Sequence, residues 1–79
     1  MSIVSLKKVN NTIVVIRENS THEYHKSMLY GIPMGDKLKV KTIEEDPVIG
    51  MIHYSQWNID GNKFKSVNEL INAFNTLIK

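Results

Sequence analysis

Three histidines are the residues of this chain that most readily suggest metal chemistry: His22, His25 and His53. His22 and His25 lie three positions apart, whereas the zinc-protease motif places two histidines four apart, so that both point the same way from a helix. Residues three apart in an extended segment point to opposite faces instead. We therefore predict ordinary surface histidines here, with no metal site and no cofactor.

A second cluster that could do chemistry is acidic, Glu44-Glu45-Asp46, and it ends at Pro47. Acid–base catalysis of the glycosidase kind needs two carboxyl groups that face each other across a cleft, which neighbours in one turn do not provide. Blocks of like charge are usually solvated, so this run indicates a surface turn. Asp60-Gly61-Asn62 lacks the other ligand positions of a calcium loop and indicates a turn as well.

No nucleophile, phosphate-binding or dinucleotide motif accompanies these residues. The sequence contains no Gly-x-Ser-x-Gly and no glycine-rich loop, and its four glycines are scattered singly. With 79 residues and none of these patterns, we predict that the protein is not an enzyme.

The composition is that of one small domain of mixed charge, spanning residues 1–79. Cysteine is absent, so no disulfide supports the core. The formal net charge is only +2, and nucleic acid is not the expected partner, because nucleic-acid-binding domains usually carry a stronger basic footprint. Neither a signal peptide nor an apolar run of about 18 residues is evident, which predicts synthesis in the cytoplasm and no membrane partner. We find no internal repeat.

Alternating apolar and polar residues predict the strands that must position these side chains. Residues 3–9 and 12–17 are β-type runs joined at Asn10-Asn11, which favours a two-residue hairpin with Leu6 opposite Val15. Residues 37–43 place three lysines on one side and apolar residues on the other, as in a half-buried antiparallel strand.

Three further segments complete the expected sheet. Residues 21–25 could form a third strand, and residues 48–54 form another, with Gly50 as a possible bulge. Asp60-Gly61 predicts a type I′ turn in a two-strand ribbon, with Trp57 opposite Phe64 and Ile59 opposite Asn62.

The C-terminal segment predicts an amphipathic helix that begins after Ser66, because Ser66 and Glu69 form a capping box. Its apolar residues recur at the spacing of one helix face: Val67, Leu70, Ile71, Phe74, Leu77 and Ile78. The fold class we expect is therefore α+β, a small antiparallel sheet of about five or six strands and hairpins packed by one C-terminal helix.

Residues 31–36 are predicted to form a loop, because Pro33 and two glycines interrupt the pattern. This loop and the residues before it are unusually apolar, and an apolar surface loop suggests contact with another chain. The alternative is a lid that folds back over the core. The residues that we predict at an interface are Met28, Leu29, Tyr30, Ile32 and Met34, with Tyr54 as a rim aromatic.

Residues 35–43, Gly-Asp-Lys-Leu-Lys-Val-Lys-Thr-Ile, resemble the Gly-Asp turn and following strand of the swapped-hairpin transition-state regulators such as AbrB. Ile32-Pro33 echoes the same family, but its Arg-rich strand and short helix are missing in order. The resemblance implies DNA binding, for which the lysines of residues 37–41 with Tyr54 and Trp57 could supply a basic aromatic face. A small nucleic-acid-binding or regulatory protein is therefore the alternative function, and a phage-encoded inhibitor is a further one.

Across most of its length the chain resembles small structural proteins of tailed bacteriophages that infect Bacteroidales, the crAss-like group. The segments that carry the resemblance are Ser-Ile-Val-Ser-Leu-Lys-Lys at residues 2–8, the Asn-Asn hairpin, Trp-Asn-Ile-Asp-Gly at 57–61 and the helical sequence at 64–75. The resemblance implies a virion component such as a capsid auxiliary or decoration protein, located first in the host cytoplasm and then in the virion. We therefore expect a non-enzymatic structural protein that acts through protein–protein contacts, as a homo-oligomer or with other structural proteins of the same assembly.

Overall fold

The computed structural model describes residues 3–44 and 46–79. Its strands form two three-stranded antiparallel sheets, in the orders β1-β2-β3 and β4-β5-β6. The first sheet contains β1 (Ile3–Val9), β2 (Thr12–Arg17) and β3 (Thr21–His25). The second contains β4 (Leu29–Met34), β5 (Lys37–Thr42) and β6 (Val48–His53).

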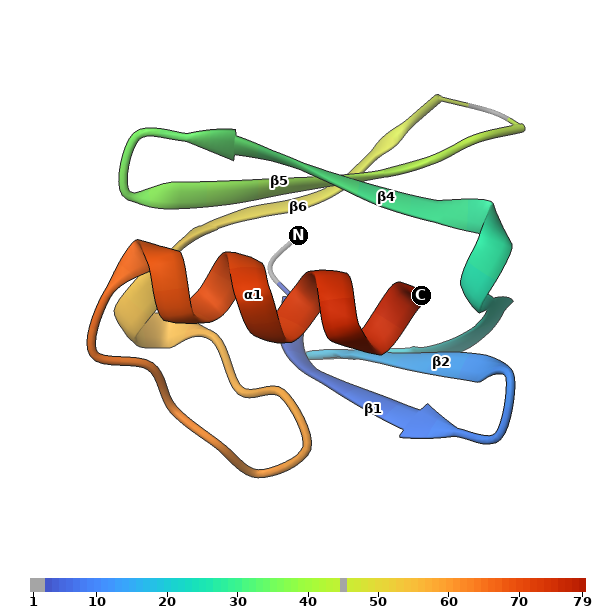
Figure 1. Cartoon of the computed structure of the whole chain (residues 1–79). Coiled ribbons are helices and arrows are strands. Elements are labelled where there is room, and N and C mark those ends of the chain that lie inside the picture. The colour runs from blue at the N-terminus through green and yellow to red at the C-terminus, as the bar shows by residue number, and fades with distance from the viewer. Residues whose placement is uncertain (1–2, 45) are drawn as a thin grey trace.

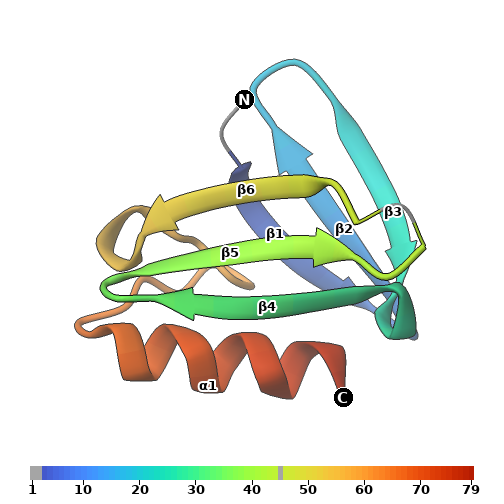
Figure 2. The same cartoon turned by 90° about the horizontal axis from the view of Figure 1, so that it is seen from above.

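The two sheets lie face to face, and the helix α1 (Val67–Ile78) runs along the open side between them, beside β4 (Figures 1 and 2). The expected α+β class is confirmed, with the six strands divided between two sheets. The buried apolar side chains between these layers form one core: Leu6, Ile13, Val15, Leu29, Leu38, Val40, Ile49, Ile52, Trp57, Ile59, Leu70, Phe74 and Leu77.

The hairpin at Asn10-Asn11 has the predicted register, with Leu6 paired to Val15 and Val9 to Thr12. Asn10 adopts a φ of 56°, a left-handed conformation that asparagine tolerates better than most residues. Thr21–His25 is the third strand. In the second sheet the register shifts beside Gly50, which is consistent with the bulge predicted there.

The helix begins as its cap predicts. The Ser66 hydroxyl accepts a hydrogen bond from the Glu69 amide (3.3 Å), while the Glu69 carboxylate accepts one from the Lys65 amide (3.1 Å) instead of from Ser66. Leu70, Phe74 and Leu77 are buried, and Ile71 and Ile78 pack against the core. The apolar stripe therefore closes this chain's own core.

Two predictions about local structure are wrong in part. Residues 31–34 do not belong to a loop, because Leu29–Met34 pairs along its whole length with β5 as an edge strand, a position in which a proline is tolerated. Only Gly35 and Asp36 form the expected turn. The ribbon at 57–64 is present only at its tip: Ile59 pairs with Asn62 as predicted, and the turn has positive φ at Asp60 (50°) and Gly61 (83°), but among the described residues no bridge joins Trp57 to Phe64. Leu6 of β1 also bonds to this segment, since its amide donates to the Asn58 carbonyl (2.8 Å) and its carbonyl accepts from the Asp60 amide (2.9 Å).

The two sheets have the same topology, although no sequence repeat predicts it. Each is a three-stranded meander followed by a short 3-10 helix, η1 (Lys26–Met28) after β3 and η2 (Tyr54–Gln56) after β6. In both halves the first amide of the 3-10 helix donates to the last residue of the hairpin turn, Lys26 to Asn11 and Tyr54 to Asp36, each at 2.9 Å. The structure therefore contains an internal repeat that we did not find in the sequence.

Candidate interaction surface

Strand β5 turns one side toward the core and the other toward solvent. Leu38, Val40 and Thr42 are buried, while the lysines between them alternate outward. The half-buried strand predicted for this segment is therefore confirmed. Its neighbours continue the alternation, and together their outer side chains make a surface on the far side of the sheet from the core.

We call this surface the open face and define it by three rows of cross-strand neighbours. The rows are Tyr30–Lys41–Val48, Ile32–Lys39–Met51 and Met34–Lys37–His53. Figure 2 looks down on this sheet, with the first sheet beneath it and α1 to one side. Ile32, Met34, Val48 and Met51 are between 37% and 52% exposed, so the lysines of β5 run between two apolar borders.

One end of the open face is neutralised by a carboxylate. Asp46 accepts a bond from Lys41 (2.6 Å) and another from the Tyr30 hydroxyl (2.6 Å). The bonds from Lys41 and then Tyr30 hold the pKa of Asp46 below its ordinary value, and the bond to Asp46 raises the pKa of both Lys41 and Tyr30. These hydrogen bonds favour the charged forms of Asp46 and Lys41, which lowers the pKa of the acid and raises that of the base. They favour the neutral form of the Tyr30 phenol, which raises its pKa.

At the other end the Asp36 carboxylate lies 2.9 Å from the Nε2 atom of His53. Lys39 lies in the middle row and Lys37 in the same row as His53, and among the described residues neither lysine has a carboxylate within salt-bridge distance. The centre of the open face is therefore positive and its borders are apolar.

The six residues predicted at an interface divide between this surface and the interior. Tyr30, Ile32 and Met34 lie together on the open face. Leu29 is only 3% exposed and belongs to the core, so its side chain is not available for a surface contact. Successive side chains of a strand point to opposite faces of the sheet, and in β4 the side chain of Leu29 points inward. For this residue, the alternative that the segment covers the core is therefore the correct one.

Met28 and Tyr54 lie in the two 3-10 helices and are half-buried. Tyr54 packs against the core and tilts over the ring of His53, with 4.4 Å between the ring centroids. Met51 and Val48 belong to the open face but were not predicted. The pairing of β6 with β5 supplies them, and the register shift beside Gly50 brings Val48 and Met51, three positions apart, to the same face, which simple alternation would not predict.

The three histidines do not converge on a metal site. Within residues 3–44 and 46–79, no group of three histidine, aspartate or glutamate side chains is placed to hold an ion. His25 and His53 instead cap the 3-10 helices that follow them, each accepting through Nδ1 from the amide two residues later, at 3.3 Å. His22 lies on β3 opposite Val15.

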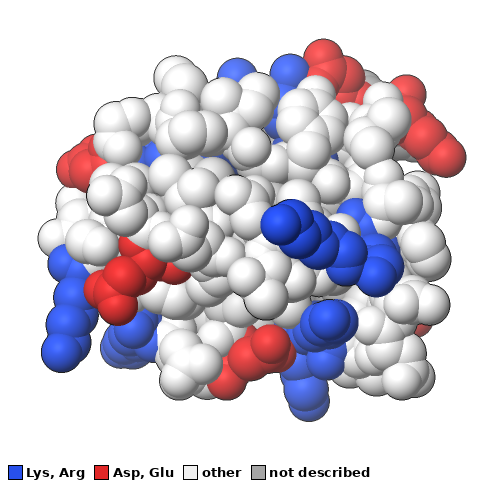
Figure 3. Space-filling view, in the orientation of Figure 1, with Lys and Arg blue, Asp and Glu red and all other residues white. Residues whose placement is uncertain are grey.

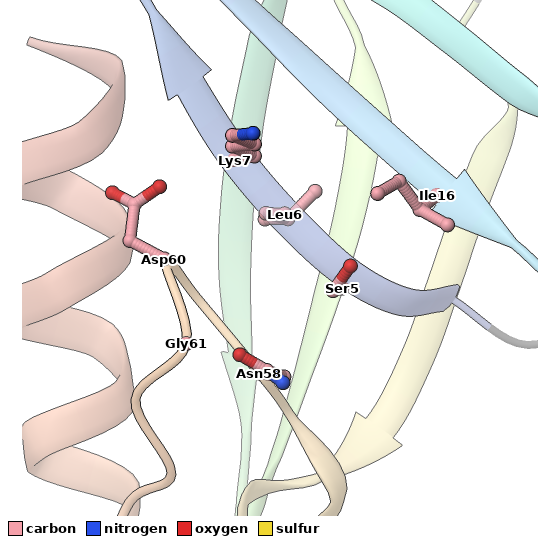
Figure 4. Close-up of a pocket in the computed structure, with 7 residues that line it drawn as sticks. All are labelled: Ser5, Leu6, Lys7, Ile16, Asn58, Asp60 and Gly61. Atoms are coloured by element: carbon pink, nitrogen blue, oxygen red, sulfur yellow. The ribbon is translucent and has the colours of Figure 1, made fainter.

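A hollow of about 260 Å³ lies on the outside of the first sheet (Figure 4). Ser5 and Lys7 of β1, Ile16 of β2 and the 58–61 segment line it. Its carboxylate, on Asp60, already accepts a bond from the Lys8 amide (3.0 Å). The hollow is smaller than the pockets of about 300–1,000 Å³ that usually hold small ligands, so it is a weaker candidate than the open face.

A groove of about 330 Å³ lies between α1 and the 59–64 turn. Its floor is apolar, formed by Ile59, Phe64 and Leu77, and its rim is polar. The charged residues that line it are one lysine and one aspartate, Lys8 and Asp60. On the side of the molecule that carries α1, basic and acidic side chains are interspersed (Figure 3), without the single-sign stripe typical of nucleic-acid-binding surfaces.

Comparisons with protein families, with curated proteins and with solved structures found no match. In the described part of the chain, no helix has the length and apolar character needed to cross a bilayer.

Proposed function

We propose that the protein is a non-enzymatic structural protein whose open face binds a neighbouring subunit of a larger assembly. The observation that carries this proposal is the apolar border on both sides of the β5 lysines. Each side chain in that border is more than a third exposed, although the chain has a complete core into which other residues of the same type are packed. Apolar residues grouped on one sheet face are typical of protein contact surfaces.

The chemistry of the open face specifies the neighbour. Lys37 and Lys39 require carboxylates, and burying them without such partners would be costly. The apolar borders require apolar side chains on both sides of those carboxylates. The neighbour is therefore a protein surface with acidic residues in a row and aliphatic residues beside them, because complementary charge fixes orientation while the apolar area contributes affinity.

The resemblance to phage structural proteins identifies the assembly that we propose: a bacteriophage virion, in which the chain is a capsid auxiliary or decoration protein. Such proteins act by adhesion to repeated shell subunits. A small chain with a flat, partly apolar sheet face suits that role, since a sheet face presents side chains at regular spacing along and across its strands.

Zero-length carbodiimide crosslinking of virions that contain the chain, followed by mass spectrometry, tests this proposal. The reagent joins an amine only to a carboxylate that touches it. We expect Lys37 and Lys39 to be joined to acidic residues of a shell protein. Crosslinks confined to Lys63 and Lys65, which lie outside the open face, would refute the proposal.

Two matched substitutions strengthen the test. Met51→Asp should remove the chain from virions, because Met51 is 49% exposed within the open face. Val9→Asp should leave incorporation unchanged, because Val9 is 45% exposed but lies on the first sheet. Salt-sensitive retention on DNA that is lost with Lys39→Gln would instead assign the open face to nucleic acid.

A further inference from the structure

The outer edge of β3 is an unpartnered strand edge. The other edges are modified: residues 58–60 pair with β1, β4 contains Pro33 and runs beside α1, and the pairing of β6 is irregular beside Gly50. Strand β3 is regular and contains no proline, and among the described residues its backbone pairs only with β2. An edge of this kind is a template for another strand.

The ladder to β2 shows which groups of β3 point outward. The Arg17 amide donates to the Ser20 carbonyl (2.8 Å), and the Lys26 amide donates to the Asn11 carbonyl (2.9 Å). In an antiparallel pair, inward-bonded residues alternate with outward ones, so between these two bonds His22 and Tyr24 bond to β2. The amides and carbonyls of Thr21, Glu23 and His25 therefore point to solvent.

The internal repeat shows what His25 lacks. His53 accepts from the Ser55 amide through Nδ1 (3.3 Å), and its Nε2 meets the Asp36 carboxylate (2.9 Å). His25 makes the same cap through Nδ1 to the Ser27 amide (3.3 Å). The equivalent of Asp36 in the first half is Asn11, and no described carboxylate lies within salt-bridge distance of His25.

Glu23 makes no such contact with His25 of its own chain, but Glu23 of a second chain could supply the carboxylate. Glu23 and His25 are exposed and lie on the same face of β3, two residues apart. When two copies of β3 pair antiparallel with Tyr24 opposite Tyr24, Glu23 of each copy stands opposite His25 of the other. This register also places the outward-pointing groups of both residues in hydrogen-bonded pairs. Shifting the centre to Glu23 would oppose two glutamates, which is unfavourable.

We propose that two copies of this chain pair through the free edges of β3, in the register centred on Tyr24. The dimer joins the two first sheets into one six-stranded sheet, with a Glu23–His25 contact on each side of the twofold axis. This contact is independent of the open face, which lies on the second sheet and remains free for a different neighbour.

Sedimentation equilibrium with charge-reversed variants tests the register. We expect the wild-type chain to dimerise reversibly, and Glu23→Lys and His25→Glu each to weaken dimerisation by about tenfold or more. An equimolar mixture of these two variants should recover dimers. In the mixed dimer the introduced lysine of one chain faces the introduced glutamate of the other, and the second contact keeps the original Glu23–His25 pair. A mixture that stays monomeric would overturn the register.

Glu23→Pro provides a second test that does not depend on charge. The Glu23 amide points outward, so proline removes a bond of the dimer and none to β2. We expect a folded monomer by circular dichroism. A wild-type chain that remains monomeric at millimolar concentration would overturn the proposal, and so would a dimer lost with Met51→Asp but kept with Glu23→Pro. The first result would leave virion binding by the open face unaffected, whereas the second would assign the open face to contact between copies of this chain.

Discussion

Gly31 lies where β4 passes against the helix, and replacing it with alanine should destabilise the fold. A Cβ atom built at Gly31 would lie 2.6 Å from Cε2 and 2.9 Å from Cδ2 of Phe74, and 3.1 Å from Cδ1 of Leu38. Carbon atoms in contact normally lie about 3.5–4.0 Å apart. The ring must therefore move by about 1 Å, and it is only 1% exposed within the core.

The magnitude follows from two opposing effects. Adding a methyl group to a packed core typically costs about 1–3 kcal/mol, whereas replacing glycine with alanine at a position without backbone strain contributes about 0.4–1 kcal/mol by restricting the unfolded chain. The steric effect is larger, because β4 and α1 confine the ring from two sides. We expect Gly31→Ala to lower the free energy of unfolding by about 1–2 kcal/mol, or roughly 4–8 °C in Tm for each kcal/mol.

Urea unfolding followed by the fluorescence of Trp57, the single tryptophan, measures this change. Phe74→Leu should relieve the clash, so the double variant Gly31→Ala/Phe74→Leu should lose less stability than the sum of the single variants, with a coupling of about 0.5–3 kcal/mol. Gly35→Ala is the control, because nothing lies within 4 Å of its Cβ and only its φ of 63° opposes alanine. If Gly31→Ala is neutral, or additive with Phe74→Leu, then α1 does not pack against β4 as described.

Two further predictions concern single contacts. Trp57→Phe removes the hydrogen bond from Nε1 to the buried Ile52 carbonyl (2.8 Å), so it should lower the free energy of unfolding by about 1–3 kcal/mol or more. Urea titrations followed by circular dichroism measure this change, and an unchanged unfolding midpoint would contradict the bond. Asp46 has a lowered pKa when folded, so its bonds stabilise the fold above its ordinary pKa of 3.8 and this contribution disappears as the pH falls through the lower folded value. Asparagine tolerates the same φ of 48°, so the variant Asp46→Asn should fold but be less stable than wild type at pH 7, and it should lose less stability on acidification below about pH 4. If the free energies of unfolding of the two proteins change with pH in the same way, the carboxylate contributes nothing.

The two proposed contacts have different symmetries, and their combination would explain a many-copy role. Pairing through β3 is isologous, because the same edge is used by both copies, and it stops at a dimer. Binding through the open face is to an unlike surface. Together they would present two open faces from one dimer, and two linked contacts can bind a repeated shell far more tightly than either alone.

Local signals in the sequence determined much of the fold. The Asn10-Asn11 hairpin, the alternation on β5, the cap at Ser66 and the apolar stripe of α1 all depend on neighbours within a few positions. Such features are expressed directly by residue type and spacing, and the structure confirms each of them.

Only the tertiary structure decided the features on which the proposals depend. Gly31 and Pro33 favoured a loop by type, but their segment pairs with β5, and Gly31 is needed because the ring of Phe74, 43 positions later, lies against it. The division of six strands into two sheets brings Met51 beside Lys39 and places His25 and His53 in equivalent sites with different partners. These relations join residues that are distant in the chain, and the burial that fixes them has no signature in local spacing.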